Sequence, residues 1–552
     1  MTNVSSPYTL SAILIILVLV STNQLAAQVP DILQDKATYL PDFSYAGYEN
    51  GLSEKGNADD AKVISVRDFG AIADDGLDDS HALIAALTSV KEEQSAVIML
   101  FEKGQYILSE ILYITRSNIV LRGTGSGALG TSIYCPRPMK YLKDPESLQE
   151  LREYLVKFNK IQKEKDNNIL LPFSQYAWSG GMIWVRKEGT RVKSYLPEYK
   201  QEKNILTKIT SGSRGALTIK VASTDKIKVG QVLQLEWYNR DGESGTLIDE
   251  IYKTRTIKIG SHHWNFPEEP LVKQQVKILA IKGSQLTLSS PLLLDINPKW
   301  TPVATTWNHL TQVGIEHLTI KFPMAETIAH HVEEGFNAIY LTRLYDGWVH
   351  DVNIVNSDAG VMTEEVANVT ISDIETSGEK LAHYSVYIGG VHNVLVDGLR
   401  VANEVRHPLS FNTFSTKSVF TNTEVLINPL LDQHSGANHQ NLFDNIEVHI
   451  SLDGKKQYPL FAGGGAGYWK PSHGSFSTFW NIKVHFLDGL EDRTPVLLNG
   501  MKDGTNARLV GVYANKPITV SYEPNAYTEW LNKEIKEIPS LYRYQLDKRL
   551  KK

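Results

Sequence analysis

The sequence predicts an all-β protein built as a parallel β-solenoid, with a capping helix near the N-terminus and a small inserted helix-plus-β subdomain. Six stretches of the second half each set an Asp or Asn among alternating apolar residues, at Asp351, Asp373, Asp397, Asn422, Asn445 and Asn481. The successive spacings are 22, 24, 25, 23 and 36 residues. A period in the twenties with strand-like alternation is typical of coils that bury their apolar faces only by stacking.

Stacking has a consequence for function. Equivalent residues on successive coils of a parallel solenoid lie about 4.8 Å apart, the spacing between hydrogen-bonded strands. Side chains that are remote in sequence therefore become neighbours on one long face. Such a face suits an extended polymer or oligomer as ligand.

Composition narrows the class of protein. The 552 residues are 42% apolar and 21% charged, which is typical of a folded, soluble chain rather than a disordered one. The formal net charge of -6 argues against nucleic acid as the main partner. Cys135 is the single cysteine, so no intrachain disulfide or thiol-rich metal site is expected.

The N-terminus reads as an export signal over residues 1–27. The apolar run from Ala12 to Val20 is too short to span a bilayer, which needs about 20 residues, but fits the core of a secretory signal. We expect cleavage near Ala27, no membrane insertion, and a secreted or periplasmic protein. Export without disulfides favours a bacterial source. Residues 28–60 then read as an extended leader.

Residues 61–136 are predicted to form the first coils together with the capping helix. The helix carries Leu83, Ile84 and Leu87 on one side, and Asp79 or Ser80 is expected to cap its N-terminus. Apolar runs at 97–101, 106–108 and 119–121 read as strands.

The same region carries a family resemblance. The run VRDFGAIADDGLDDSHALIAAL, followed by VIMLFEKGQYIL and NIVLRGTGSG, resembles the opening of the pectate-lyase-like right-handed parallel β-helix superfamily. Lyases, hydrolases and phage tailspikes share this opening, so the resemblance implies the fold and leaves the chemistry open. For the aspartates of the run we expect turn and cap duties, with a hydrolytic carboxylate pair as the alternative; they are Asp74, Asp75, Asp78 and Asp79.

Residues 137–300 are predicted to be an insertion, consisting of a helix after Asp144-Pro145 and an antiparallel β subdomain with a long loop over 239–270. Trp264 in that loop is a candidate sugar-stacking residue. Residues 301–500 form the main β-helix and residues 501–552 a C-terminal extension, in which 528–537 reads as a helix.

The polar stretches between the repeat strands carry histidines at similar positions within their coils. Each also offers a cation or an aromatic residue. The candidate catalytic residues are His383, Tyr384, Arg406, His407, His434, His439, Lys470 and His473, and Lys380 and Trp469 are candidates for substrate binding. Stacked coils would gather these side chains in one place, although polar residues in solenoid turns often only satisfy buried backbone groups.

This set of side chains suits β-elimination from a uronic acid. A histidine, with an ordinary pKa of about 6.5, can remove the weakly acidic C5 proton. A cation can hold the charge that develops on the carboxylate, and a tyrosine or second histidine can protonate the departing oxygen. The leading hypothesis is therefore a carbon–oxygen lyase that acts on an anionic carbohydrate. The departing group is either a sugar or water. Bacterial systems that degrade the algal polysaccharide ulvan include a dehydratase of this general β-helix type, and the chain is similar to it in this respect.

Two alternatives stay open. A glycoside hydrolase needs two carboxylates, for which Asp358, Glu364 and Asp373 are candidates on neighbouring coils. A non-catalytic carbohydrate-binding solenoid needs neither a pair of carboxylates nor a group of catalytic histidines. We expect no cofactor and no obligatory metal, because only Asp432 accompanies the histidines and no metal-binding spacing is present. His330, His331 and His350 rank below the other histidines as candidates, and His350, beside Asp351, is expected to be a turn or surface residue.

Overall fold

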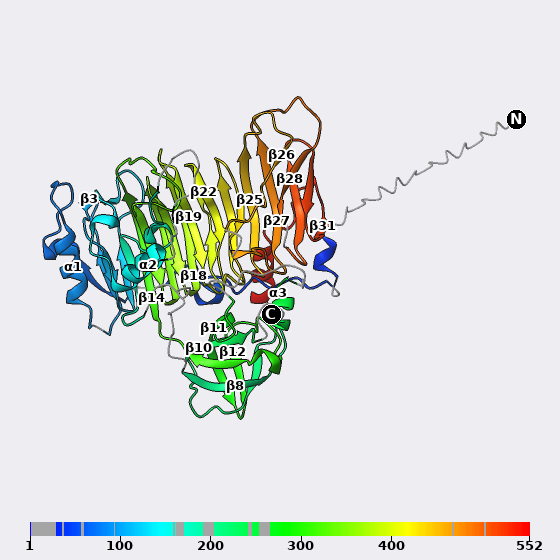
Figure 1. The fold of residues 1–552 in the computed structure, drawn as a ribbon, viewed down its shortest axis with the longest axis horizontal. Helices are drawn as coiled ribbons and strands as arrows, with labels where there is room; N and C mark the ends of the chain where they lie inside the picture. The colour runs from blue at the N-terminus through cyan, green and yellow to red at the C-terminus, as the bar shows by residue number, and fades with distance from the viewer. Residues whose placement is uncertain are drawn as a thin grey trace.

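The computed structural model describes residues 1, 29–35, 38–56, 60–92, 94–157, 161, 170–190, 204–240, 245–252, 265–465, 469–501 and 504–551. The predicted signal segment therefore lies outside the described residues except for Met1. Figure 1 shows the predicted right-handed parallel β-helix, whose coils stack along the long axis, with a β subdomain on one side. Over the described part of the chain, no helix has the length and apolar character needed to cross a membrane.

Two long parallel sheets form the walls of the β-helix. Within the described residues the larger sheet has 15 strands: β1 (Lys62–Ser65), β2 (Val97–Leu100), β5 (Ile119–Arg122), β14 (Leu310–Lys321), β16 (Leu344–Val355), β18 (Ala367–Ser377), β20 (Leu395–Asp397), β23 (Val419–Val425), β25 (Leu442–Ile450), β27 (Thr478–Phe486), β29 (Arg508–Ala514) and β31 (Tyr527–Glu529) in order, with β3 (Gly104–Ile107), β6 (Thr131–Tyr134) and β21 (Arg400–Val401) beside them. The second sheet contains β4 (Leu112–Ile114), β7 (Ile183–Val185), β15 (Asn337–Thr342), β17 (Ala359–Glu364), β19 (Ala382–Gly389), β22 (Val405–Phe411) and β24 (Leu431–Gln433). A smaller parallel sheet of β26 (Gln457–Tyr458), β28 (Val496–Met501) and β30 (Ile518–Tyr522) lies in the last coils.

The repeated Asp and Asn residues turn the strands of the larger sheet. All of them except Asp397 have a left-handed backbone, with φ between 49° and 56°, a conformation that Asp and Asn tolerate better than most residues. Their side chains also form a ladder along the stack. The Asn422 amide donates to Asp397 Oδ1 at 2.7 Å, and the Asn445 amide donates to Asn422 Oδ1 at 2.8 Å. The predicted coil repeat is confirmed by these pairings.

Helix α1 (Ser80–Ser89) covers the first coils and buries Leu83. The predicted cap by Asp79 is wrong, because its carboxylate instead accepts hydrogen bonds from the backbone N–H groups of Ile72 (3.0 Å) and Ile107 (2.9 Å). Asp74 likewise accepts from the Gln105 N–H at 2.9 Å. These two aspartates therefore fasten the turn to the next coil, as expected for structural residues.

The inserted subdomain is a closed antiparallel barrel. Its strands are β8 (Ile205–Ser211), β9 (Thr218–Val221), β10 (Val232–Tyr238), β11 (Pro270–Lys282), β12 (Gln285–Leu288) and β13 (Val303–Thr306). Helix α2 (Glu146–Lys157) precedes the barrel, and helix α3 (Thr246–Tyr252) docks on the later coils, where the Tyr252 hydroxyl donates to the Pro471 carbonyl at 2.9 Å. The predicted insertion 137–300 also contains β7, which pairs with β4 and β15 of the β-helix.

The two chain ends meet on the outer face of the larger sheet. Leader residue Phe43 packs in one apolar cluster with Trp480 and with Leu541 of helix α4 (Leu541–Leu550). The helix predicted over 528–537 is wrong, because Tyr527–Glu529 forms β31 and pairs with β29. The helix begins only after Ser540, whose side chain accepts from the Arg543 N–H.

Short 3-10 helices complete the described structure; they are η1 (Asp31–Leu33), η2 (Tyr48–Gly51), η3 (Val66–Phe69), η4 (Met139–Tyr141), η5 (Gln175–Ala177) and η7 (Pro298–Trp300).

Candidate active site

Strand register brings several of the predicted histidines together on the second sheet. Strands β19, β22 and β24 are neighbours, and their pairing sets Tyr384 beside His407 and Ser410 beside Asp432. His434 follows β24 directly. The ring centroids of His383 and His407 are 5.6 Å apart, and those of His407 and His434 are 4.6 Å apart. Residues separated by about one coil in sequence thus form one cluster, as the solenoid predicts.

One carboxylate organises the C-terminal part of this cluster. Asp432 is fully buried, and its Oδ2 lies 3.0 Å from Nδ1 of His407 and 2.9 Å from Nδ1 of His434. The Ser410 hydroxyl donates to the same oxygen at 3.0 Å, and the Gly464 N–H donates to Oδ1 at 2.8 Å. His434 is therefore hydrogen-bonded to Asp432, and Nδ1 of His407 lies within ion-pair distance of the same oxygen.

The charges of this unit follow from its surroundings. Burial raises the pKa of Asp432, but attraction to His434 and His407 outweighs it, so the pKa lies well below the ordinary value. Burial lowers the pKa of His434, and Asp432 offsets this only in part. Asp432 is therefore an anion and His434 a neutral imidazole near pH 7. When Nδ1–H points at the carboxylate, Nε2 carries the free lone pair.

A second carboxylate–histidine unit lies beside the first. Oε1 of buried Glu333 lies 3.1 Å from Nδ1 of His383, and Nε2 of His383 lies 3.1 Å from Nε2 of His330. Burial raises the pKa of Glu333, while burial and repulsion from His407 lower the pKa of His383 well below its ordinary range. His383 is therefore a neutral imidazole near pH 7, and Glu333 takes up a proton more readily than an exposed glutamate does.

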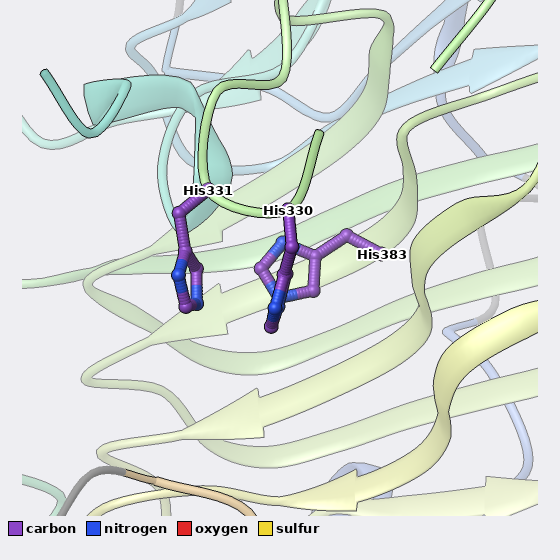
Figure 2. Close-up of side chains that lie close together, drawn as sticks. All are labelled: His330, His331 and His383. Atoms are coloured by element: carbon purple, nitrogen blue, oxygen red, sulfur yellow. The ribbon is translucent and has the colours of Figure 1, made fainter. Parts of the chain in front are cut away.

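The loop over residues 322–336, between β14 and β15, delivers His330 and His331 to the cluster. Figure 2 shows both rings reaching from this loop toward His383. His330 and His331, which ranked below the other histidines on sequence alone, are thus part of the cluster. The sequence reading missed them, and it missed Glu333, because the loop has no strand periodicity. The local run His330-His331-Val332-Glu333 was the available signal.

Lys380 has a different role from the substrate contact that the sequence suggested. Its ammonium group is buried, lies 2.6 Å from Oδ1 of Asp358 and sits over the Phe336 ring. The other oxygen of Asp358 accepts from the N–H groups of Gly335 (3.0 Å) and Phe336 (2.9 Å). The ion pair therefore anchors the end of the histidine loop inside the fold.

Positive charge borders the cluster on two sides. Arg406 is partly exposed next to His407, and its charge adds to burial in lowering the pKa of His383. Lys470 donates to the Gly463 carbonyl and to the Ser472 hydroxyl, each at 3.0 Å. Burial and the Lys470 charge lower the pKa of the adjacent His473 to about 3.

Tyr384 supports the cluster from within. Its ring is fully buried and stacks on His407 with 5.3 Å between centroids and 27° between planes. The buried ring fits packing better than proton donation.

Gly464 shapes the site in a way that the sequence did not reveal. A Cβ atom at this position would lie 1.9 Å from Nδ1 of His434. The neighbouring Gly463 also passes close to His473, where a Cβ atom would lie 2.5 Å from the ring. The run Gly463-Gly464-Gly465 was the available signal, since close backbone approach requires glycine.

Three predicted residues are not part of the cluster. His439 lies at another corner, where it bridges to Thr416 and its Nδ1 contacts the Ala437 carbonyl at 3.1 Å. The left-handed backbone at Ala437 and Ser435 separates it from His434. Trp469 packs against the core of the inserted barrel. Trp264 lies outside the described residues.

The carboxylates proposed for hydrolysis do not face the histidines as a pair. Asp358 is committed to Lys380, and Asp373 is exposed on the larger sheet, 3.4 Å from Nδ1 of His350. Glu364 is buried in β17, on the second sheet. His350 is likewise on the larger sheet, in β16.

No family model matches the chain, and no curated protein matches it. Solved structures with a similar fold include the tailspike protein gp49 from Pseudomonas phage LKA1, with 14% identity and a TM-score of 0.46 over 85% of this chain and 80% of that one. They also include the A-module of the mannuronan C-5 epimerase AlgE4 from Azotobacter vinelandii (11%, 0.35, 85% and 96%). A third is DFA-IIIase from Arthrobacter chlorophenolicus A6 in complex with DFA-III (11%, 0.35, 89% and 88%). At these identities the likeness concerns the fold.

Proposed function

We propose that the protein is a carbon–oxygen lyase that acts on uronic-acid-containing carbohydrate by β-elimination. One observation carries the proposal: an oxygen of buried, ionised Asp432 lies within 3.0 Å of Nδ1 of both His407 and His434, beside Arg406. Two histidines with free Nε2 atoms supply a base and, once one is protonated, an acid.

The reaction assigns a step to each group. Nε2 of His407 removes the C5 proton, and the electrons of the C5–H bond form a C4–C5 double bond as the C4–O bond breaks. Asp432 stabilises the imidazolium that results, as a buried carboxylate behind a catalytic histidine does. The newly protonated His407 then returns this proton to the departing oxygen. Arg406 pairs with the uronate carboxylate, whose negative charge grows in the transition state.

Hydrolysis fits the geometry less well. The carboxylates next to the histidines are Glu333 and Asp432, and both are buried. A hydrolase needs two carboxyl groups that reach either side of the glycosidic bond. Around Asp432 the imidazoles of His407 and His434, rather than the carboxylate, are the groups nearer to solvent.

The proposal extends to the substrate, the leaving group and the location of the protein. The long face of stacked coils suits a poly- or oligosaccharide, with ulvan-derived oligomers among the candidates. The leaving group is the next sugar in a polysaccharide lyase or water in an oligosaccharide dehydratase. The apolar segment of residues 12–20 supports export to the periplasm or medium.

A product screen tests the proposal. The full chain is incubated with a panel of uronate polymers and their oligomers, including ulvan, and products are followed by mass and by the absorbance of unsaturated uronates. Unsaturated fragments identify a polysaccharide lyase, and loss of one water without cleavage identifies a dehydratase. Addition of water, or binding without any product, would refute the elimination chemistry.

A pair of variants then tests the site. His407→Ala should abolish product formation, because it removes the proposed base. His449→Ala is the matched control, since His449 lies in β25 on the other sheet and contacts Glu424 at 3.1 Å. Unchanged turnover in His407→Ala would exclude this residue as the base.

A further inference from the structure

We infer that His330, His331 and His383 form a binding site for a divalent transition-metal ion of the Zn²⁺ type. One ring nitrogen from each residue lies within 4.8 Å of the others. Neutral imidazole nitrogens are the preferred ligands of Zn²⁺ and related ions, and three protein ligands with one open position are typical of reactive zinc sites. This site goes beyond the elimination chemistry and does not depend on it.

The spacing of the nitrogens fits a shared ion. Nε2 of His330 and Nε2 of His383 are 3.1 Å apart. Tetrahedral coordination with Zn–N bonds of about 2.0–2.1 Å places two ligand nitrogens roughly 3.3–3.4 Å apart. The two imidazoles thus already have nearly the separation that one metal ion imposes.

The backbone holds two consecutive histidines on the same side. Neighbouring side chains of an extended chain point in opposite directions, but His331 has a left-handed φ of 70°. Its ring consequently stacks on the ring of His330, with 3.6 Å between centroids and 25° between planes (Figure 2).

The inserted segment holds the ring of His331 in place. The ring of His331 packs 4.5 Å from Phe173 and stacks on Trp178 at 5.3 Å, measured between centroids. The Ser174 N–H also donates to the His331 carbonyl at 2.6 Å. These contacts shield the cluster from one side and limit rotation of the imidazole.

Glu333 supplies the partner that metal-bound histidines usually have. Its Oε1 lies 3.1 Å from Nδ1 of His383, and Nε2 of the same ring lies 3.1 Å from His330. The other carboxylate oxygen of Glu333 is buried and accepts no hydrogen bond from the described residues. A carboxylate behind a ligating histidine fixes its tautomer and raises its basicity.

The position of the site relates it to the proposed reaction. The ring of His407 lies 6.0 Å from that of His330 and 5.6 Å from that of His383. On the basis of the proposed function, an ion here would share the uronate carboxylate with Arg406. The binding test below uses no substrate, so its failure would leave the elimination chemistry standing.

The test measures metal content and affinity on the full chain. The purified protein is stripped with a chelator, loaded with Zn²⁺, desalted and analysed for bound metal, and Zn²⁺ binding is titrated by calorimetry. We expect one tightly held ion per chain. His330→Gln and His383→Gln should each lose stoichiometric binding, and Glu333→Gln should weaken it by about 10–100-fold.

The control variant carries His449→Gln and His485→Gln together. These two rings stack at 4.8 Å on the larger sheet beside Glu447 and form another group that could attract metal. Binding should survive this double change. Loss of binding in the control, or equal binding in wild type and His330→Gln, would overturn the assignment.

The visible absorption of bound Co²⁺ provides a second test, which needs no variant. Co²⁺ bound by three imidazoles in a four-coordinate site should give intense visible absorption, whereas surface-bound Co²⁺ stays octahedral and weakly coloured. Failure of the wild-type protein to retain Zn²⁺ or to develop this spectrum would mean that His330 and His383 simply share a hydrogen bond.

Discussion

Replacing Asp432 by Asn is the change that tests the organisation of the proposed active site most sharply. The carboxylate is hydrogen-bonded to His434 and Ser410 at one oxygen and to the Gly464 N–H at the other, and Nδ1 of His407 lies 3.0 Å from the first oxygen. An asparagine amide offers a single oxygen. In either orientation its NH₂ group therefore meets a donor, and at least one buried contact is lost.

The expected magnitudes for stability and catalysis differ. Losing a buried hydrogen bond to a charged group costs about 1.5–3 kcal/mol, and removing the buried charge offsets part of this cost. We expect the free energy of unfolding to fall by about 1–3 kcal/mol, which leaves the protein folded. Catalysis should suffer more, because the imidazoles lose both their tautomer and the charge that stabilises the imidazolium. General acid–base catalysis contributes typically about 10²–10⁴-fold, so kcat should fall by that factor.

The assay follows unsaturated product and thermal unfolding of the same preparation. KM should change little, because Arg406 still pairs with the substrate carboxylate. Asp373→Asn is the control, since Asp373 is an exposed residue of the coil ladder and equivalent positions naturally carry Asn422, Asn445 and Asn481. An Asp432→Asn variant with wild-type kcat and normal folding would refute the role of Asp432.

Three further changes have specific expected outcomes. Gly464→Ala should reduce kcat strongly and lower the free energy of unfolding by about 1–3 kcal/mol, because its Cβ would lie 1.9 Å from Nδ1 of His434. Gly127→Ala is the control: no atom lies within 4 Å of the Cβ position there, so this variant should match wild type in both assays. Lys380→Met should cost about 3–5 kcal/mol by leaving Asp358 buried without its cation, and adding Asp358→Asn should recover part of the loss in denaturant unfolding; no recovery would contradict the pairing. Burial raises the pKa of Asp444 to about 6 from the ordinary value of 3.8, so the folded state binds this proton more tightly than the unfolded chain. Its contribution to stability should therefore fall by roughly 3 kcal/mol as the pH rises from about 4 to about 6, and Asp444→Asn should remove that part of the pH dependence; an identical profile in the variant would contradict the shift.

The coil architecture could be predicted because the physics of each coil repeats. A left-handed turn at one position of every coil favours Asp or Asn, so the preference appears in the sequence at the coil period. Stacking of strands in register then carries His383, His407 and His434 into one cluster. Register is a property of the whole repeat, and local errors in strand limits do not disturb it.

The rest of the site lies outside the strand repeat, so the coil period does not point to it. His330, His331 and Glu333 lie in an irregular loop whose path is set by Asp358, by the insertion and by the strands beneath. The sequence around Lys380 suggested a substrate contact, but in the structure Lys380 forms a buried ion pair with Asp358.

The C-terminal end of the chain also could not be predicted from local sequence. Residues 528–537 have an acceptable helical pattern, but pairing of β31 with β29 outweighs that preference. The helix forms instead at Leu541–Leu550, where Asp444 accepts from the Leu541 N–H at 2.7 Å and the apolar residues cover the sheet.

The most direct measurement is proton NMR of the product formed from a uronate oligomer that the protein converts. Elimination predicts a new vinylic H4 signal together with loss of the H5 signal, and both changes should be absent with His407→Ala. A retained H5 with a new reducing end would show hydrolysis. In deuterated water, an H5 replaced by deuterium without any vinylic signal would show exchange or epimerisation at C5. Either of these results would contradict β-elimination by the cluster that Asp432 organises.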